Sequence, residues 1–526
     1  MSRRNAGSGC PRQTTHGEMK PEFFRKWPMC LPMRARPLAR RTARHRQDEQ
    51  MSLLADIDAA AADAANAEDM AGETGNIAQS CPKVTLEIGV FFDGTLNNRF
   101  NVALRNREDA SYQSALSNPA LLWARYKNGT RYDVKNSCGG VDRRFSSIYV
   151  QGAGSVRGEG DDMVGYATGM GRRSGVESRV LWGFRQVLAR IGQSGGPPNI
   201  RKVVLDVFGF SRGAASARYF VNCIRAGRIR YDPFGVGDFR EELPRGLKVE
   251  IRFLGIFDTV AAIGDASDDD NEPVNVHLKP AQVTGQIYHL VASDEYRLNF
   301  RLNRNWPSGG EYIHLPGAHS DVGGGYRDAG DAAEMSGKSR RPFRTRAEAE
   351  RAQARTRAED LARGANRADE AVFVREGWLT ANETQGGIVR KMSPIRAVTS
   401  YSHAMQSMVT RYYYDEWLAL DRPWVRVGLS RIALHMMHER AMRFVNGAFL
   451  PLPTSDPNYV IPAALRPYEA EIRSGRLSGA RRAQVLRNFG HVSMKDGAWI
   501  SGNRLGHRPA ANHIRGWAPN IPGRAI

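Results

Sequence analysis

The amino-acid sequence predicts an α/β fold, in which a mostly parallel sheet is flanked by helices. Strand-like and helix-like segments alternate from about residue 82 onward, the pattern of chains that build parallel sheets. One segment, Lys202–Phe208, is an almost continuous apolar and β-branched run, as expected of a central strand buried on both faces. With 526 residues, of which 41% are hydrophobic, the chain is long enough to enclose such a core.

The expected elements follow in chain order. Apolar residues at helical spacing predict a helix over Val176–Ile191, and the Gly-rich stretch 152–171 before it must be a loop. The apolar stretch around His289 looks helix-like. Strands are expected at Val84–Phe92, Ser147–Val150, Lys202–Phe208, Val249–Phe257 and Tyr312–Leu315.

Composition divides the chain into four regions. Residues 335–371 are rich in Ala, Arg and Glu without an apolar stripe, which is typical of a solvated helix or a disordered loop. Met, Tyr and Trp at mixed helical spacing over 388–445 predict helices that cover one end of the sheet. We therefore expect a disordered basic tail and acidic Ala-rich linker (1–80), a catalytic core (81–334), a polar helical or disordered insertion (335–385), and a mostly helical cap and C-terminal region (386–526).

Charge and cysteine content limit the possible partners and compartment. The net charge of +20 suits an anionic partner, but much of the excess lies in residues 1–46, which are either a disordered tail or codons upstream of a start at Met51. The five cysteines have neither a CxxC pair nor metal-ligand spacing, so we expect free thiols, a reducing cytosol and no metal. Without a long apolar run, we expect a protein made in the cytoplasm and exported, if at all, without a cleaved signal.

The segment Gly209–Gly213 (GFSRG) fits the pattern G-x-S-x-G. Gly209 and Gly213 would let a strand and a helix approach closely around Ser211, whose side chain is then pushed out at the carboxyl end of the sheet. The motif directly follows the central strand and directly precedes small residues that suit a tightly packed helix. This context favours a nucleophilic serine on an α/β-hydrolase-like sheet over an inert Gly-Ser turn.

A serine nucleophile also needs hydrogen-bond donors for the oxyanion that forms during acyl transfer. The backbone N–H of Arg212 follows the nucleophile at a helix N-terminus, so we expect it to be one donor. The loop after the first strand is expected to supply the second, from Gly94 or Thr95. A turn that merely caps the strand is the alternative for each of these two residues.

The base and its carboxylate partner are expected in the order Ser, Asp, His along the chain. Asp258 follows the strand Val249–Phe257, so its carboxylate would emerge at the same sheet edge as Ser211; a turn or N-cap aspartate is the alternative. His319 lies in a Gly-rich loop that can bend back over the nucleophile. Its rivals as the base are His289, His314 and His491.

Four motifs in this order resemble the lipase effectors of bacterial type VI secretion and the wider group of α/β hydrolases with the same catalytic domain. They are FFDGTLNN (91–98), GFSRGAASAR (209–218), GIFDTV (255–260) and PGAHSDVGGGY (316–326), and the likeness extends over roughly residues 84–330, with a weaker likeness in Leu429–Met442. The resemblance implies a phospholipase that attacks membranes with the triad Ser211, Asp258 and His319. It also implies no cofactor, delivery through a secretion spike protein, and a cognate immunity protein.

We therefore predict a serine lipase or phospholipase that hydrolyses carboxylic ester bonds of membrane phospholipids and acts as an antibacterial effector. The alternatives are an esterase acting on soluble esters and a non-catalytic basic module that binds nucleic acid, although nucleic-acid-binding motifs are absent. Tyr412–Tyr414, Trp417, Trp424, Met405 and Met408 are expected either to cover an acyl groove as an interfacial anchor or to form ordinary core.

Overall fold

The computed structural model describes most of the chain between residue 83 and residue 492. Residues 79–526 form one compact unit, whereas the expected tail and linker, residues 1–80, lie outside the described part. The expected subdivision of the compact unit into core, insertion and cap stays a prediction. The described residues are 83–492 and 517–518, apart from residues 172, 233–238, 264–275, 277–281, 296, 298–299, 306–308, 335–338, 364–372, 381–386 and 403.

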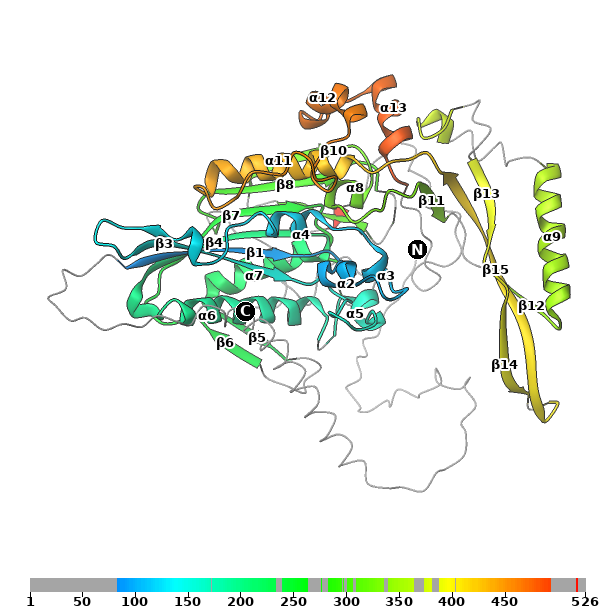
Figure 1. The fold of residues 1–526 in the computed structure, drawn as a ribbon, viewed down its shortest axis with the longest axis horizontal. Helices are drawn as coiled ribbons and strands as arrows, with labels where there is room; N and C mark the ends of the chain where they lie inside the picture. The colour runs from blue at the N-terminus through cyan, green and yellow to red at the C-terminus, as the bar shows by residue number, and fades with distance from the viewer. Residues whose placement is uncertain are drawn as a thin grey trace, which may run out of the picture. The chain divides into compact units, whose positions relative to one another are not determined.

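A mixed seven-stranded sheet forms the centre of this unit (Figure 1). Six of its strands pair in parallel, and the short seventh strand at one edge is antiparallel to its neighbour. The α/β fold with a mostly parallel sheet is confirmed. In sheet order the strands are β10 (Glu311–Leu315), β8 (Gln286–Ala292), β7 (Val249–Phe257), β4 (Ile200–Phe210), β1 (Val84–Phe92), β3 (Val141–Val150) and β2 (Val134–Lys135).

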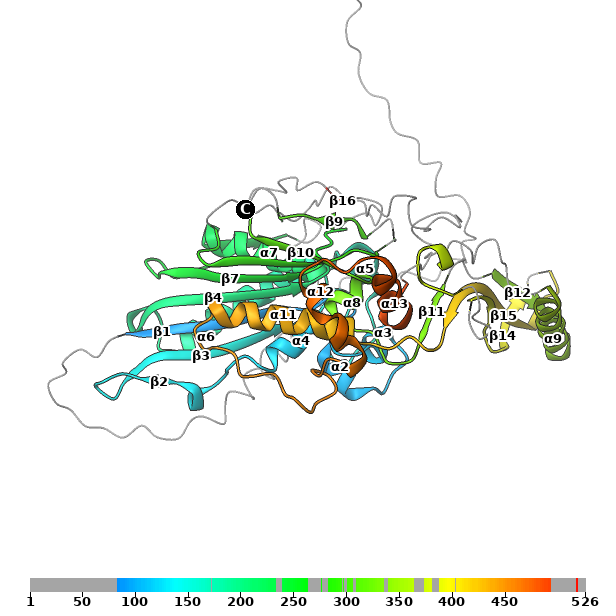
Figure 2. The same ribbon diagram turned by 90° about the horizontal axis from the view of Figure 1, so that it is seen from above.

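Helices cover both faces of this sheet, because the central strands bury alternating side chains on each side. In β4, Val207 joins the apolar cluster that includes α6 (Val176–Gln193) and α7 (Arg212–Ala226). The next residue, Phe208, joins the cluster on the other face, which includes α4 (Asn118–Trp123) and α11 (Leu429–Phe444). Figure 2 shows α11 running along the strands. The helices are α2 (Arg99–Leu104), α3 (Ala110–Gln113), α4 (Asn118–Trp123), α5 (Met163–Thr168), α6 (Val176–Gln193), α7 (Arg212–Ala226), α8 (His319–Gly323), α9 (Arg346–Arg363), α11 (Leu429–Phe444), α12 (Glu469–Arg473) and α13 (Gly479–Phe489).

The expected strands are all present, with β1 and β7 at the predicted bounds. The helix-like interpretation around His289 is wrong, because Gln286–Ala292 is strand β8, between β7 and β10. A short, mostly apolar run fits both helical and strand periodicity. This segment is a strand that is buried on both faces of the sheet.

The helices predicted over 388–445 are also wrong for the first part of that range. Residues 387–422 form strands of a second sheet around the long strand β15, and only α11 is helical as expected. β15 contains three consecutive tyrosines (Tyr412–Tyr414) together with Val409, Thr410 and Trp417, and the β-propensity of these residues outweighs the loose helical spacing seen in the sequence. The strands of this sheet are β11 (Asp331–Glu334), β12 (Ser339–Phe343), β13 (Gly387–Met392), β14 (Arg396–Ser402) and β15 (Ser407–Arg422); two small pairs are β5 (Arg228–Tyr231) with β6 (Phe239–Glu242), and β9 (Leu302–Asn303) with β16 (Trp517–Ala518).

The polar insertion contains helix α9, which is consistent with the helical alternative for this segment. Tyr414 is buried in the second sheet, whereas Met405 and Met408 lie exposed at the turn between β14 and β15. Met408, Tyr412–Tyr414 and Trp417 therefore belong to β15 of the second sheet, while Met405 and Trp424 lie in turns beside it, and the role of the set as an acyl cover stays a prediction. Among the described helices, none is long and apolar enough to span a bilayer.

Candidate active site

Ser211 lies on a sharp turn between β4 and α7. Its backbone angles, φ 59° and ψ −129°, are strained for a residue with a side chain, as expected of a nucleophile held on a tight strand-to-helix turn. A Cβ atom on Gly209 would lie 2.4 Å from the Gly213 carbonyl oxygen, and one on Gly213 would lie 2.2 Å from the Asp93 carbonyl oxygen. The two motif glycines are therefore required by close backbone approach on both sides of the serine.

The register of β4 and β7 places Asp258 beside Ser211. Phe210 pairs with Phe257, and the N–H of Ser211 donates to the Phe257 carbonyl at 3.1 Å. Asp258 comes next, fully buried and with a positive φ of 43°. Because parallel strands end at the same edge of the sheet, the two side chains emerge from adjacent loops, as the sequence predicted.

His319, at the start of α8, is bound directly to Asp258. Its Nδ1 lies 2.5 Å from Oδ2 of the carboxylate, while Oδ1 accepts a hydrogen bond from the Ala292 N–H at 2.9 Å. Since the carboxylate accepts, Nδ1 carries the proton and Nε2 is left with its lone pair. Within the described residues Nε2 has no hydrogen-bond partner although it is buried, so it is available to take a proton.

Two aromatic rings pack against the imidazole of His319 at the end of β4. The ring centroid of Phe210, the residue before Ser211, lies 4.5 Å from that of His319. The Phe300 ring meets the imidazole edge-on, with a centroid distance of 4.9 Å. A Cβ on Gly323 would lie 2.0 Å from the Phe210 ring, so the glycine lets α8 approach β4. The structure thus brings Asp258 and His319 into contact and packs His319 against the residue beside Ser211.

Burial lowers the pKa of His319 below its usual 6.5, and the hydrogen bond and negative charge of Asp258 oppose this shift only in part. We expect ester hydrolysis to depend on neutral His319, so activity should be retained down to below pH 6.5 and then fall as the imidazole takes up a proton. Initial rates on a soluble chromogenic ester, measured from acid to neutral pH, give the midpoint of this loss of activity. The stability of the enzyme is checked at each pH. An acid-side midpoint above 6.5 would contradict the assignment.

The three expected oxyanion donors differ in their present partners. The Gly94 N–H donates to the Asp93 carboxylate at 2.8 Å, so it is engaged. Thr95 and Arg212 have backbone N–H groups without a partner in the described part of the chain, and the Arg212 Nε donates to the Thr95 hydroxyl at 2.7 Å. The oxyanion roles stay predictions, with Thr95 and Arg212 the better placed.

Comparison with known proteins agrees with this geometry. Residues 236–342 match the family "T6SS, Phospholipase effector Tle1-like, catalytic domain". A solved structure of the Tle1 effector bound to the VgrG spike of the type 6 secretion system is 21% identical, with a TM-score of 0.51 over 86% of this chain and 98% of that chain. This chain is similar to the Tle1-like phospholipase effectors. The resemblance predicted from the four motifs is thereby confirmed.

Other comparisons add less. An uncharacterised protein from Pseudomonas aeruginosa aligns at 25% identity with a TM-score of 0.33, over 47% of this chain and 43% of that chain. No curated protein matches the chain. The region matched to the Tle1-like family includes Asp258 and His319 but begins after Ser211.

The rival histidines have other partners in this Tle1-like fold. In β8, the Nε2 of His289 accepts a hydrogen bond from the Thr259 N–H at 3.1 Å and its Nδ1 lies 2.7 Å from the Asn305 side chain, which makes it a satisfied core residue. His314 lies exposed in β10. No group of three or more potential metal ligands lies together in the described part of the chain.

The fourth candidate, His491, forms a second buried pair. Its Nδ1 lies 2.7 Å from Asp321, two residues after His319, and its backbone N–H donates to the same carboxylate at 2.8 Å. Asp321 also accepts from the Ala318 N–H at 2.9 Å, which caps α8. This pair therefore supports the helix that carries His319.

Sequence reasoning missed Asp93, a buried carboxylate between β1 and the predicted oxyanion loop. Asp93 lies within the motif FFDGTLNN and directly before Gly94, but neither position reveals its role, because its side-chain partners are distant in the sequence.

Proposed function

We propose that the chain is a serine-dependent phospholipase of the A type with an α/β-hydrolase core, in which Ser211, His319 and Asp258 form the triad. The observation that carries the proposal is the buried Asp258–His319 pair, whose free Nε2 belongs to a ring packed against the residue next to a strained serine. A nucleophile on a tight turn, a base and an orienting carboxylate are the parts that acyl transfer needs.

The reaction proceeds in two steps. His319 Nε2 accepts the Ser211 hydroxyl proton as Oγ attacks the ester carbonyl, Asp258 stabilises the imidazolium, and the N–H groups of Thr95 and Arg212 bind the oxyanion. The imidazolium then protonates the leaving alcohol, which gives an acyl-enzyme. A water molecule, deprotonated by His319, attacks this ester and releases the fatty acid and free Ser211.

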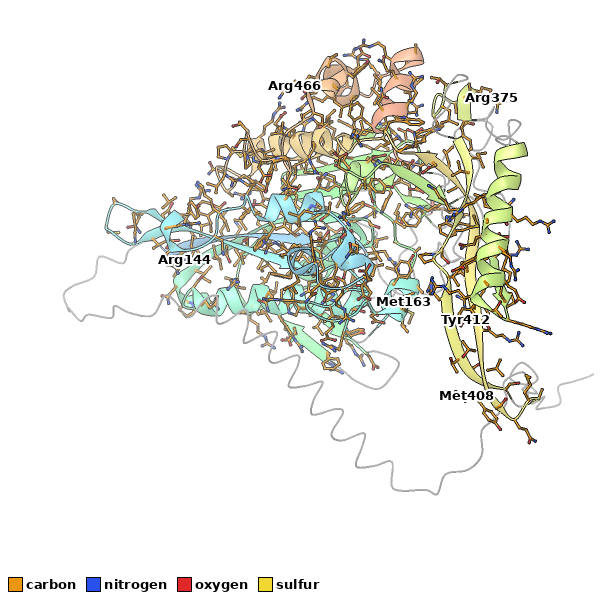
Figure 3. The ribbon with its side chains drawn as sticks, turned by 45° about the vertical axis from the view of Figure 1, so that its right-hand side comes forward. Arg144, Met163, Arg375, Met408, Tyr412 and Arg466 are labelled. Carbon is orange, nitrogen blue, oxygen red and sulfur yellow. The ribbon has the colours of Figure 1, made fainter. Side chains whose placement is uncertain are left out.

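Helix α5 favours a phospholipid over a soluble ester as the substrate. Met163 and Val164 on α5 are 65% and 58% exposed, and Figure 3 shows the Met163 side chain at the surface. The Arg212 guanidinium joins this helix to the site, since Nη2 donates to the Tyr166 carbonyl at 2.5 Å and Nε to Thr95. An apolar surface so close to the nucleophile suits acyl chains at a membrane interface.

The test replaces the exposed pair of α5 with polar residues, as Met163→Gln/Val164→Gln. Fatty-acid release from phosphatidylethanolamine/phosphatidylglycerol vesicles should fall about tenfold or more, because each apolar side chain that enters the lipid contributes roughly 1.5–3 kcal/mol. Hydrolysis of a short-chain soluble ester should be unchanged. Mass spectrometry of the released products identifies the bond that is cut.

A matched control is Met405→Gln/Met408→Gln, which alters two equally exposed methionines at the turn between β14 and β15, where Figure 3 labels Met408. The α5 proposal predicts wild-type behaviour of this variant on both substrates, whereas the interfacial anchor considered from the sequence predicts a loss on vesicles alone. An equal loss on vesicles and soluble ester in the α5 variant would favour the esterase alternative, and a vesicle-specific loss only in the control pair would move the membrane contact to the hairpin.

We further propose that the protein is loaded on a secretion spike protein in the cytoplasm of the producing cell, and that an immunity protein protects that cell from it. The fold shared with a Tle1 effector that was solved bound to the VgrG spike supports a spike partner. Co-purification of the full chain with a VgrG-type spike protein from the same organism tests this partner.

A further inference from the structure

Asp93 lies where three loops of the proposed site meet. It follows β1 directly and is 2% exposed. Its carbonyl oxygen is the atom that leaves no room for a Cβ on Gly213, so the backbone of Asp93 contacts the turn that presents Ser211. The mechanism above assigns this carboxylate no step.

Three donors from separate segments bind the Asp93 carboxylate. The Ser117 hydroxyl donates to Oδ1 at 2.5 Å, the Tyr149 hydroxyl to Oδ2 at 2.5 Å, and the Gly94 N–H to Oδ1 at 2.8 Å. Ser117 is the N-cap of α4, and Tyr149 lies in β3. A buried carboxylate with three short hydrogen bonds fixes the groups around it, because leaving any of them unpaired is costly.

One of these hydrogen bonds acts on the oxyanion loop. While the Gly94 N–H binds Asp93, it cannot also bind an oxyanion, so donation falls to Thr95 and to Arg212. The same bond fixes the Gly94–Thr95 turn on the end of β1. Asp93 therefore leaves the Thr95 N–H, and not the Gly94 N–H, to bind the oxyanion, and it fixes the position of the Gly94–Thr95 turn.

The second link leads from Ser117 to the helix of the base. Ser117 forms a β-bridge with Gly324, directly after α8, and the neighbouring Asn118 side chain donates to the Val322 carbonyl at 2.8 Å. Through Ser117, the Asp93 carboxylate is joined to the segment that carries His319.

We propose that Asp93 is a positioning residue for ester hydrolysis, whose carboxylate holds the Gly94–Thr95 oxyanion loop in register with the Ser211 turn and with α8. This inference rests on the proposed function, since it assigns a role within the same site. It concerns placement of the donors and not contact with the substrate.

The charge on Asp93 makes the proposal testable by pH. Burial raises the pKa of Asp93 to about 6, while the hydrogen bonds from Ser117, Tyr149 and Gly94 and the positive charge of Arg99 oppose the rise. The carboxylate is thus charged at neutral pH. Below pH 6 it takes up a proton and can no longer accept from all three donors, so placement of the loop is lost on the same acid limb as the base function of His319.

The decisive variant is Tyr149→Phe, which keeps the ring but removes the hydroxyl that donates to Asp93 Oδ2 and accepts from the Arg99 N–H. Loss of a hydrogen bond to the charged form should raise the pKa of Asp93 further, so the acid-side midpoint of kcat on a soluble ester should move to higher pH with KM unchanged. Asp93→Asn should lower kcat at neutral pH about a hundredfold, the cost of a small misplacement of catalytic groups, again with little change in KM. Its acid limb should then report His319 alone.

Tyr126→Phe is the matched control, because the Tyr126 hydroxyl donates at 2.7 Å to another fully buried carboxylate, Asp206, outside the site. It should leave the pH profile unchanged. An unshifted acid limb in folded Tyr149→Phe, an equal shift in Tyr126→Phe, or wild-type kcat in Asp93→Asn would each overturn the proposal. If Asp93→Asn does not fold, Tyr149→Phe decides. Failure of the proposed function itself is distinguished beforehand, since the wild type would then show no Ser211-dependent hydrolysis.

Discussion

Ser211→Ala should reduce hydrolysis of both vesicle phospholipid and soluble ester by about a thousandfold or more, the usual cost of removing a triad nucleophile. Without Oγ no acyl-enzyme can form, and only the oxyanion donors and binding remain. The loss should appear in kcat, with little change in melting temperature, because the substitution removes one hydroxyl and leaves the backbone hydrogen bonds of the turn in place. Steady-state kinetics with both substrates measure it.

A matched control for this variant is Ser216→Ala. Ser216 is also buried and lies one turn and a half along α7, but its hydroxyl donates to the Arg212 carbonyl at 2.9 Å, within the helix. It should retain wild-type activity. If Ser211→Ala keeps its rate, or if a fluorophosphonate probe adds a mass to a residue other than Ser211, the nucleophile lies elsewhere.

Asp258→Asn should reduce kcat about ten-thousandfold while the fold is kept. The amide of asparagine can still accept from the Ala292 N–H, but its NH₂ group donates to His319 Nδ1. The proton of the imidazole then moves to Nε2, the atom that must accept from Ser211, so the base has the wrong tautomer. Rates on soluble ester and the rate of fluorophosphonate labelling at Ser211 should fall together.

Labelling of Ser211 at the wild-type rate in Asp258→Asn would contradict this role. It would mean that His319 is not the group that activates the serine. A melting temperature within a few degrees of wild type is needed to exclude a folding defect, because Asp258 is fully buried.

Local patterns carried the prediction of the central sheet and of the candidate site. Strands β1 and β7 were placed at the bounds observed, because each is an apolar run stopped by a turn residue at the sheet edge. That turn residue is also what identified Asp258, and chain order then pointed to His319, which the structure places 2.5 Å from it. Parallel strands convert such sequence positions into spatial neighbours, so the geometry follows from few residues.

What the sequence could not reveal depends on contacts between distant segments. The strands over residues 387–422 were mistaken for helices because spacing alone does not show which partner strand pairs with β15. Asp93 looked like a turn residue, since nothing near it identifies Tyr149 or Ser117 as donors. The pairing of Asp321 with His491, 170 residues away, is likewise invisible in a single sequence.

The Asp321–His491 pair limits how far the chain can be shortened for expression. The part matched to the Tle1-like family ends at residue 342, and a recombinant fragment cut there would lack His491 and also α11, whose apolar side packs on β7 and β8. Such a fragment would expose the apolar surface of the sheet that α11 covers, and we expect it to aggregate. The shortest fragment that we expect to fold must therefore extend past residue 491, well beyond the motif at 316–326.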